Sequence, residues 1–367
     1  MSGSRRRAFA AAGVTLALVA CIGTSRILLD SGAATCPARR GGAEAAVDWY
    51  VPAAAGDRNA LDPWCAAVGP TVLDTVPESN GWMVGGDRLR ILVWNVSAGG
   101  GRLEDFLRQE AGVRCGPAAE ASPPFVLLAQ EVYRRSEEVP RTASGATISA
   151  PAAERDRDGP RDDVVAIARR CGLALFYVPS VRNGTEEYRD GREDRGNALL
   201  ANVALHDPVA IELPAEDARR HAIGATVRHP SGDSVRLVSL HFTLLPKLWR
   251  NLTTGNAARI RHALGMLDAL ERIGRARGAP GAMATLAAGD ANTWSQGDAA
   301  LRRLRVAFPD SPPPIARGTR GPFPADHLFF RRGAVAGGSI EPGSYRRLES
   351  DYSSDHHPVA AIYRFRP

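Results

Sequence analysis

The C-terminal stretch Ser353-Ser354-Asp355-His356-His357-Pro358-Val359 places an Asp-His pair directly before an apolar run. That run, from Pro358 to Tyr363, predicts a buried strand. An acid and an imidazole side by side at the start of a strand can hold a phosphate or a metal-bound group. Because polar residues often precede strands, the pair gains meaning only from other strand ends in the chain.

Five further apolar runs carry a polar residue at one end. They are Arg90 to Asn95, Phe125 to Glu131, Leu237 to His241, Met283 to Asp290, and Asp326 to Phe330, in which Asp326 comes first. Strand ends that meet at one edge of a sheet can assemble a site from residues that are distant in sequence. We therefore expect these polar residues to lie close to His356.

The rest of the pattern is rich in strands. Period-2 or fully apolar runs predict strands over 89–95, 124–130, 173–178, 197–202, 222–228, 235–241, 283–289, 326–331 and 358–365. Gly255 to Ala276 carries a helical apolar stripe, and Arg102 to Glu110 and Asp162 to Arg170 are shorter amphipathic helices, the latter with Asp162 as its N-cap. Many strands with few helices between them predict two packed sheets flanked by helices.

Taken in order, these segments resemble the endonuclease/exonuclease/phosphatase superfamily, which includes pancreatic-type deoxyribonucleases, abasic-site endonucleases, inositol polyphosphate 5-phosphatases and neutral sphingomyelinases. The residues that carry the resemblance are Asn95, Gln130-Glu131, Gly196-Asn197-Ala198-Leu199-Leu200, Leu240-His241, Gly289-Asp290-Ala291-Asn292, Asp326-His327 and Ser354-Asp355-His356. The resemblance covers residues 87–367 and implies an α+β fold, a four-layer α/β/β/α sandwich of two mixed sheets flanked by helices. Asp290 to Ser295 is similar to an exported bacterial subgroup.

The resemblance implies a Mg²⁺-dependent hydrolase of phosphate esters, with Mn²⁺ as an alternative cation. Mg²⁺ prefers oxygen ligands and usually takes one or two carboxylates. A carboxylate at the end of an apolar strand is costly to leave unpaired, which makes Glu131 the first candidate ligand. The family positions imply Asn95 and Asp355 as further ligands, whereas a strand-end cap is the alternative role for Asn95.

Asp290 and Asn292 are two residues apart, so their side chains face the same way if the backbone is extended. Asp290 can then orient or deprotonate a water and Asn292 can bind a phosphate oxygen, whereas the alternative is an Asx-turn that closes the strand. The family positions imply that His356 contacts the scissile phosphate. They also imply that Asp326 pairs with His356, which would favour the imidazolium.

His241 resembles a second phosphate-contacting or acid group of the deoxyribonuclease-like and sphingomyelinase-like branches. A carboxylate just before the next strand is the candidate that orients it, Asp194 ahead of Glu193. Arg195 and Arg182, together with Arg219-Arg220, are candidates for binding the substrate phosphate. The alternative for all of them is an ordinary solvated charge in a loop before a strand.

The N-terminus indicates export. Arg5-Arg6-Arg7 precedes a short apolar stretch, which is typical of a signal peptide over residues 1–23. Leu18-Val19-Ala20-Cys21 looks like a bacterial lipobox, so that Cys21 would carry a lipid and attach the protein to a membrane; a plain cleaved signal and an uncleaved anchor are the alternatives. We expect an exported protein on the outer face of the membrane, in the periplasm or secreted, with an irregular extension over residues 24–86.

The cysteine count agrees with export. If Cys21 is set aside, four cysteines remain, and an even number in a secreted chain suggests two disulfides. Proximity along the chain favours Cys36 with Cys65 and Cys115 with Cys171, although three connectivities exist. The chain contains no Cys-x-x-Cys, which gives a zinc or thioredoxin-like site no support.

Composition weakly favours a polyanionic substrate. The net charge is +6 and 44% of the 367 residues are hydrophobic, enough for one large core. A modest basic excess does not by itself identify a nucleic-acid binder. We expect a monomer that hydrolyses phosphodiesters, with nucleic acid before lipid. The alternatives are a phosphatase or sphingomyelinase-like enzyme that acts on lipid head groups, and a non-catalytic binding protein on the same fold.

Overall fold

The protein is described by a computed structural model. It covers residues 29–30, 46–78, 81–82, 86–116, 122–141, 143, 148–149, 161–183, 192–244, 255–277, 281–334 and 337–366.

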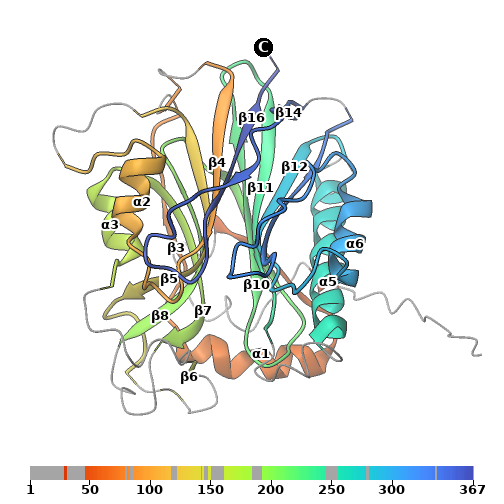
Figure 1. The fold of residues 1–367 in the computed structure, drawn as a ribbon. Coiled ribbons are helices and arrows are strands. Elements are labelled where there is room, and N and C mark those ends of the chain that lie inside the picture. Colours follow the sequence, from red (N-terminus) through yellow and green to blue (C-terminus); the bar gives the residue numbers. More distant parts are fainter. Residues whose placement is uncertain are drawn as a thin grey trace, which may run out of the picture.

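Two mixed sheets form the centre of the molecule (Figure 1). The nine-stranded sheet runs β14 (Ser339–Ile340), β16 (Val359–Arg364), β4 (Arg88–Asn95), β5 (Phe125–Arg135), β8 (Glu193–Ala201), β7 (Ala174–Asn183) and β3 (Val72–Asp74), with β15 (Arg346–Arg347) paired to β16 and β6 (Ile148–Ser149) paired to β7. The seven-stranded sheet runs β1 (Leu29–Asp30), β2 (Asp48–Pro52), β9 (His206–Glu212), β10 (His221–Arg228), β11 (Ser234–His241), β12 (Ala284–Asp290) and β13 (Asp326–Arg331).

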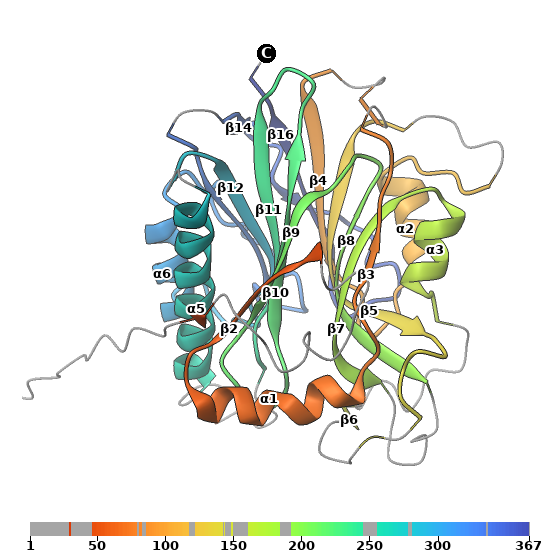
Figure 2. The ribbon, with the colours of Figure 1, turned by 180° about the vertical axis from the view of Figure 1, so that it is seen from behind.

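Helices cover the outer face of each sheet. α2 (Leu103–Glu110) and α3 (Val164–Arg170) pack on the nine-stranded sheet, and α5 (Gly255–Ala276) and α6 (Ala299–Ala307) pack on the seven-stranded sheet (Figures 1 and 2). The predicted four-layer α/β/β/α sandwich is therefore confirmed.

Strand alternation divides the core into three layers, because successive side chains point to opposite faces of a sheet. On β11, Leu237 faces the other sheet, whereas Val238 and Leu240 face α5 and α6. On β4, Ile91 faces inward and Leu92 faces α2. Nearly all of these side chains are fully buried, so burial on both faces of each central strand drives the assembly of the sandwich.

The sequence predicted most elements within a few residues. α5 spans the residues predicted for it, and the nine predicted strands are all present. The prediction of Asp162 as the cap of α3 is wrong, because Asp163 accepts hydrogen bonds from the backbone N–H groups of Val165 and Ala166. Asp162 instead accepts one from Glu104 N at 3.2 Å, in the first turn of α2. A tertiary contact thus decides which aspartate caps which helix.

The expectation of an irregular extension over 24–86 is wrong for residues 48–74. This segment forms β2, α1 (Ala55–Ala67) and β3, so that it adds a strand to each sheet. Figure 2 shows α1 crossing one end of the molecule between α5 and β7. α1 contains Pro63 and its N-cap Ala54 makes no side-chain capping bond, so the usual sequence marks of a helix start are missing.

The disulfide predicted between Cys115 and Cys171 is confirmed, and it joins the segment after α2 to the C-cap of α3. Cys65 in α1 is also disulfide-bonded. Its predicted partner Cys36 lies outside the described residues, as do residues 1–23 with Cys21. Among the helices that the structure describes, none is long and apolar enough to cross a membrane.

A buried ion pair fastens the segment after α1 to the nine-stranded sheet. The Asp194 carboxylate, with none of its surface exposed, accepts hydrogen bonds from Arg134 Nε at 2.9 Å, Tyr177 Oη at 2.8 Å and Gly69 N at 2.8 Å. Arg134 in turn donates to Pro70 O at 2.6 Å. The pair therefore links β5, β7 and β8 to the chain that leads into β3.

We expect Asp194→Ala to lower the free energy of unfolding by about 3–5 kcal/mol, because it leaves the Arg134 guanidinium buried without its anion. Urea denaturation measures this loss. In the double variant Arg134→Met/Asp194→Ala the loss should be smaller, since the uncompensated charge is gone. The control Glu104→Ala, in an exposed pair with Arg170, should change stability by less than about 1 kcal/mol. An Asp194→Ala effect as small as the control would contradict this role.

Candidate active site

The site is built where strand ends from both sheets meet. β4 and β5 are parallel and reach the same edge, with Asn95 opposite Gln130. β11 and β12 are parallel, with His241 opposite Asp290, and β13 begins beside them with Asp326 opposite Asp290. His356 precedes β16, which runs antiparallel to β4. The topology therefore gathers side chains from six segments at one edge.

Asp326, His356 and Asp290 form a buried charged cluster. His356 Nδ1 lies 2.7 Å from Asp326 Oδ2, and His356 Nε2 lies 3.8 Å from Asp290 Oδ2. Burial lowers the pKa of His356, but the charges of Asp326 and Asp290 outweigh it and raise the pKa to about 9. His356 is therefore an imidazolium at neutral pH, positioned by one carboxylate and facing a second.

Asp290 is held by two donors. Asn95 Nδ2 donates to its Oδ2 at 2.9 Å, and Asn292 N donates to its Oδ1 at 2.7 Å. Burial raises the pKa of Asp290 to about 6, with His356 opposing the rise and Asp326 adding to it. The carboxylate is thus ionised at neutral pH yet basic enough to accept a proton.

His241 is a neutral donor at the same point. Burial and then the charge of Arg220 hold the pKa of His241 well below its usual value. Arg220 Nη1 lies 3.3 Å from His241 Nδ1, and because a guanidinium only donates, Nδ1 accepts and Nε2 carries the proton. That Nε2 is buried, has no hydrogen-bond partner among the described residues, and lies 3.6 Å from both Glu131 Oε1 and Asp290 Oδ2. It can therefore donate to a substrate oxygen placed between them.

Glu131 occupies a strained position in β5. Its φ is +54°, in the left-handed region, and the register between β5 and β8 shifts between Ala129 and Val132. Such bulges re-aim a side chain, and strain of this kind gathers at functional sites. Glu131 is connected to the charged cluster through His241. Its Oε1 lies 3.6 Å from His241 Nε2, which lies 3.6 Å from Asp290 Oδ2, and that oxygen lies 3.8 Å from His356 Nε2.

A metal ion could be bound at two places, by Asp290, Asp326 and His356 or by Glu131. One oxygen or nitrogen atom each of Asp290, Asp326 and His356 lies within 4.8 Å of the others, but Asp326 is already engaged by His356. Glu131 makes no hydrogen bond to any residue that the structure describes, so its oxygens can accept a cation. Carboxylate oxygens suit a hard divalent ion such as Mg²⁺.

The other two residues predicted to bind metal have protein partners. Asn95 Oδ1 accepts from Ser97 N at 2.9 Å while its amide donates to Asp290. Asp355 Oδ2 lies 2.9 Å from Arg320 Nη2. His356 and Arg320, against the effect of burial, lower the pKa of Asp355, so it is an anion at neutral pH. Both carry oxygen atoms beside the cluster, but they are engaged locally.

Asn292 serves the loop in which it lies. Its φ is +51°, and its Nδ2 donates to Phe242 O at 2.9 Å, which ties the end of β12 to the chain leaving β11. The hydrogen bond from its backbone N–H to Asp290 Oδ1 forms the Asx-type turn that the sequence analysis left open as an alternative. Asn292 thus fixes Asp290 and His241 relative to each other.

Two of the substrate-binding predictions are wrong. Asp194 is bound to Arg134 and does not orient His241, whose Nδ1 faces Arg220. Arg182 is fully buried and donates to the backbone oxygen of Arg141 at 3.1 Å and to that of Pro140, so it is a structural residue. Sequence position could not reveal either role, because both residues lie at strand ends and face away from the site.

The third prediction, Arg195, lies at the border of the site. It is buried, its Nε is 4.0 Å from Glu131 Oε2, and its Nη1 donates to Asn183 Oδ1 at 3.2 Å. Arg195 therefore places a positive charge beside Glu131 without forming a close pair with it.

Arg320 was missed by the sequence analysis, and Arg220 was recognised only as part of a basic pair. Burial lowers the pKa of Arg320, but Asp355, Asp290 and Glu131 raise it overall, so its charge faces the acidic side of the site. The neighbouring Arg219 binds Glu212. In a chain with one lysine and 45 arginines, an arginine carries little information by itself, and only its tertiary neighbours separate Arg320 from the rest.

The sequence profile of the Endonuclease/Exonuclease/phosphatase family matches residues 92–356. No curated protein matches the chain. Among solved structures, the human Nocturnin catalytic domain with bound sulfate is similar at 15% identity and a TM-score of 0.48, covering 81% of this chain and 98% of that one.

Two further structures are similar. An endonuclease/exonuclease/phosphatase from Beutenbergia cavernae shares 16% identity with a TM-score of 0.47 and covers 76% of this chain and 72% of that one. Truncated TDP2 from Caenorhabditis elegans shares 14% identity with a TM-score of 0.41 and covers 77% of this chain and 99% of that one. Likenesses at this level do not reveal the substrate of this chain.

We expect a histidine NMR titration of the metal-free protein to give His356 a pKa of about 9. The same titration should give His241 a pKa well below that of an ordinary histidine. In Asp326→Asn the His356 pKa should fall, because the carboxylate that favours the imidazolium is lost. The exposed-site variant Asp310→Asn is the control and should leave it unchanged. An unchanged His356 pKa in Asp326→Asn would refute the charged cluster.

Proposed function

Since the chain belongs to the Endonuclease/Exonuclease/phosphatase family and is a hydrolase of phosphate esters, we propose that it is an exported enzyme that uses Mg²⁺ to hydrolyse phosphodiester bonds, with nucleic acid as the favoured substrate. The observation that carries this proposal is the position of Asp290. Its Oδ2 lies 3.6 Å from the neutral His241 and 3.8 Å from the cationic His356. A base between a neutral donor and a cation suits a phosphate that gains charge during attack.

The chain's own groups would divide the reaction as follows. Asp290 orients a water and takes its proton while the water oxygen bonds to phosphorus. The ester P–O bond on the opposite side breaks, and the leaving oxygen takes a proton from a second water, whose hydroxide accepts the proton held by Asp290. The His356 imidazolium and the His241 Nε2–H donate to the phosphate oxygens, where charge develops.

Glu131 is the residue that would hold the cation, with Asn95 and Asp355 beside the cluster as further oxygen donors. A bound Mg²⁺ supplies charge neutralisation at the phosphate. Asp326 acts indirectly, because it keeps His356 in its protonated form. Arg195 and Arg320 add positive charge at the rim, which lowers the cost of bringing in an anion.

Nucleic acid is favoured over lipid by charge. The chain carries an excess of six positive charges, and Arg320, with 38% of its side chain exposed, lies at the site. A polyanion gains from several such contacts, whereas a single head group gains from one. The signal peptide predicted over residues 1–23 supports a location outside the cytoplasm, with the enzyme either free or attached through Cys21.

A lipid head group is the second candidate, and one sequence observation favours it. The apolar stretch from Phe242 to Trp249 directly follows His241. Phe242 is buried in the core, whereas Leu245, Leu248 and Trp249 lie outside the described residues. Together with a lipidated Cys21, this stretch would bring the site to a bilayer.

We expect purified protein with Mg²⁺ or Mn²⁺ to cleave plasmid DNA or RNA faster than sphingomyelin or phosphoinositides in liposomes. Asp290→Asn should lower kcat/KM about 10²–10⁴-fold, because it removes the general base. Glu131→Gln should raise the Mg²⁺ concentration needed for half-maximal rate, and the exposed-site control Glu349→Gln should change neither quantity.

Each outcome of this panel has a distinct meaning. Preferential cleavage of lipid, lost on replacing Leu245, Leu248 and Trp249 by Ser, would replace nucleic acid by the lipid substrate. A Glu131→Ala protein equal to the parent on every substrate would support a non-catalytic protein instead.

The pH dependence follows from the two pKa values. Asp290 must be ionised, so the rate rises as pH passes about 6, and His356 must be protonated, so the rate falls as pH passes about 9. We therefore expect a bell-shaped profile of kcat/KM. In Asp326→Asn the alkaline limb should move to lower pH because the pKa of His356 falls, and the acid limb should also move to lower pH, because Asp326 no longer raises the pKa of Asp290. A profile that is flat between pH 5 and 10 would exclude this pair of groups.

A further inference from the structure

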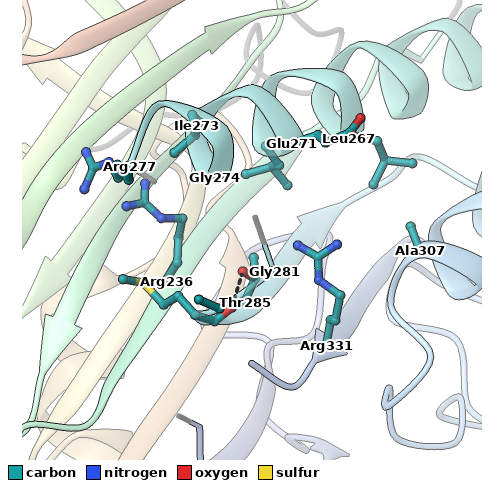
Figure 3. A pocket seen from close by; sticks show the side chains of 13 residues that line it. Arg236, Leu267, Glu271, Ile273, Gly274, Arg277, Gly281, Thr285, Ala307 and Arg331 are labelled. Atoms are coloured by element: carbon teal, nitrogen blue, oxygen red, sulfur yellow. Dashed lines mark hydrogen bonds between the residues drawn. The ribbon is translucent and has the colours of Figure 1, made fainter. Parts of the chain in front are cut away.

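A cavity lies at the far end of the strands that carry the active site. It has a volume of about 430 Å³ and lies between the last turns of α5 and the outer face of the seven-stranded sheet. We call it the α5 cavity. Its lining includes Arg236, Arg277, Thr285 and Arg331 together with apolar residues of α5. Figure 3 shows Arg236 and Arg331 projecting from the sheet toward α5 on either side of Thr285.

The cavity and the active site use the same three strands. Arg236 lies opposite Thr285, and Thr285 lies opposite Arg331, in a row five residues away from the row of His241, Asp290 and Asp326. An odd separation along a strand puts side chains on opposite faces. Five residues also span roughly 17 Å. The α5 cavity is therefore separate from the active site in both face and position.

Arg236 brings a buried and incompletely satisfied charge to this cavity. Only 4% of the residue is exposed. Its Nη2 donates to Thr226 Oγ1 at 3.0 Å, whereas its Nη1 is buried without a hydrogen-bond partner in the described part of the chain. Burial and the neighbouring Arg277 lower the pKa of Arg236 to about 10, which still leaves it cationic at neutral pH. A buried cation of this kind calls for an anion.

Arg331 repeats the pattern on the other side of Thr285. Its Nε is buried and also lacks a hydrogen-bond partner within the residues that the structure describes, while its guanidinium lies 5.8 Å from the centre of the Phe308 ring. Both arginines thus line one cavity, and each keeps one buried nitrogen without an acceptor among the described residues. Guanidinium groups suit carboxylate and phosphate oxygens because their donors form a planar fork.

The nearby carboxylates are already engaged by other arginines. Arg277 lies 2.8 Å from Asp207 and 3.3 Å from Asp48, and Glu271 lies 3.0 Å from Arg275. Within the described part of the chain, no carboxylate forms an ion pair with Arg236 or Arg331. The charges of Asp207 and Asp48 act on Arg236 only from beyond ion-pair distance, so the positive charge of Arg236 and Arg331 is not closely matched by these carboxylates.

Apart from Glu271, which pairs with Arg275, and the glycines Gly274 and Gly281, the remainder of the lining is apolar. Leu267, Leu270 and Ile273 come from α5, Met283 from the chain before β12, and Ala307 from the end of α6. An inorganic anion would fill only the arginine end of a 430 Å³ space. A ligand that fits the whole cavity needs an anionic head and an apolar body, in the size range of small organic molecules.

We propose that the α5 cavity binds a small amphipathic anion, with its carboxylate or phosphate group between Arg236 and Arg331 and its apolar body against α5. This site goes beyond the proposed phosphodiester hydrolysis and does not depend on it. The ligand occupies the outer face of β11, β12 and β13, whose opposite face carries His241, Asp290 and Asp326.

Isothermal titration calorimetry of the full chain in EDTA tests the proposal, because removal of divalent cations takes the hydrolytic reaction out of the measurement. The probes are octanoate and octyl phosphate below their micelle-forming concentrations, with octanol and inorganic phosphate as half-ligands. We expect at least one amphiphile to bind once per chain, and both half-ligands to bind at least about tenfold more weakly, since each lacks one of the two kinds of contact. The two amphiphiles together distinguish a carboxylate from a phosphate head.

Variants locate the binding. Arg236→Met and Arg331→Met keep an apolar side chain of similar length, and each should weaken binding about tenfold or more. Arg303→Met, on α6 outside the cavity, is the matched control and should bind as the parent does. Asp290→Asn should also bind unchanged, which separates this site from the active site. If Arg236→Met does not fold, amphiphile binding by the Arg331→Met variant, at a partly exposed position, decides the test.

The proposal is overturned if neither amphiphile binds the parent, or if binding survives in both arginine variants. It is also overturned if Asp290→Asn abolishes binding, which would place the ligand in the active site. Loss of hydrolysis in Asp290→Asn with amphiphile binding intact leaves the α5 cavity supported whatever the natural substrate is.

Discussion

The register of three strands fixes the geometry on which this enzyme depends. β11, β12 and β13 align so that Asp290 stands between His241 on one side and Asp326 on the other. A slip of one residue would turn each of these side chains to the opposite face of the sheet. Because both faces of these strands are filled with buried apolar residues, such a slip would also misplace the core. Packing of the sandwich and alignment of the catalytic groups are therefore one constraint.

Different neighbours give two similar buried histidines different protonation states. His241 and His356 lie on either side of Asp290, yet one is neutral and the other charged. The difference comes from their second partners, an arginine for His241 and a carboxylate for His356. Asp290 is less acidic than usual because it is buried, while the amides of Asn95 and Asn292 hold it in place. One acid-base pair thus arises from neighbours in the structure.

The same strands carry a second polar row on their other face. Arg236, Thr285 and Arg331 occupy the layer under α5, where the neighbouring positions are apolar. Burying guanidinium groups in such a layer is costly unless an anion meets them. Elsewhere the chain meets this cost internally, as Asp194 does for Arg134 and Glu212 does for Arg219. Against that background, the α5 cavity stands out as a place where the compensating charge comes from outside the chain.

Local pattern was enough to locate the core strands, α5, and the polar residues at the ends of the strands. Apolar runs of strand length mark the strand ends, and the family resemblance singles out the functional polar residues there. The residues identified in this way were Asn95, Glu131, His241, Asp290, Asp326 and His356. The partners of charged side chains could not. Asp194, Arg182, Arg220 and Arg320 look alike in sequence, but Asp194 and Arg182 are buried in the scaffold and Arg220 and Arg320 face the site. An ion pair depends on distance in space, and residues such as Asp326 and His356 come within 2.7 Å only after the two sheets have packed. Folding of the extension into β2, α1 and β3 likewise depends on sheet edges that exist only in the assembled domain.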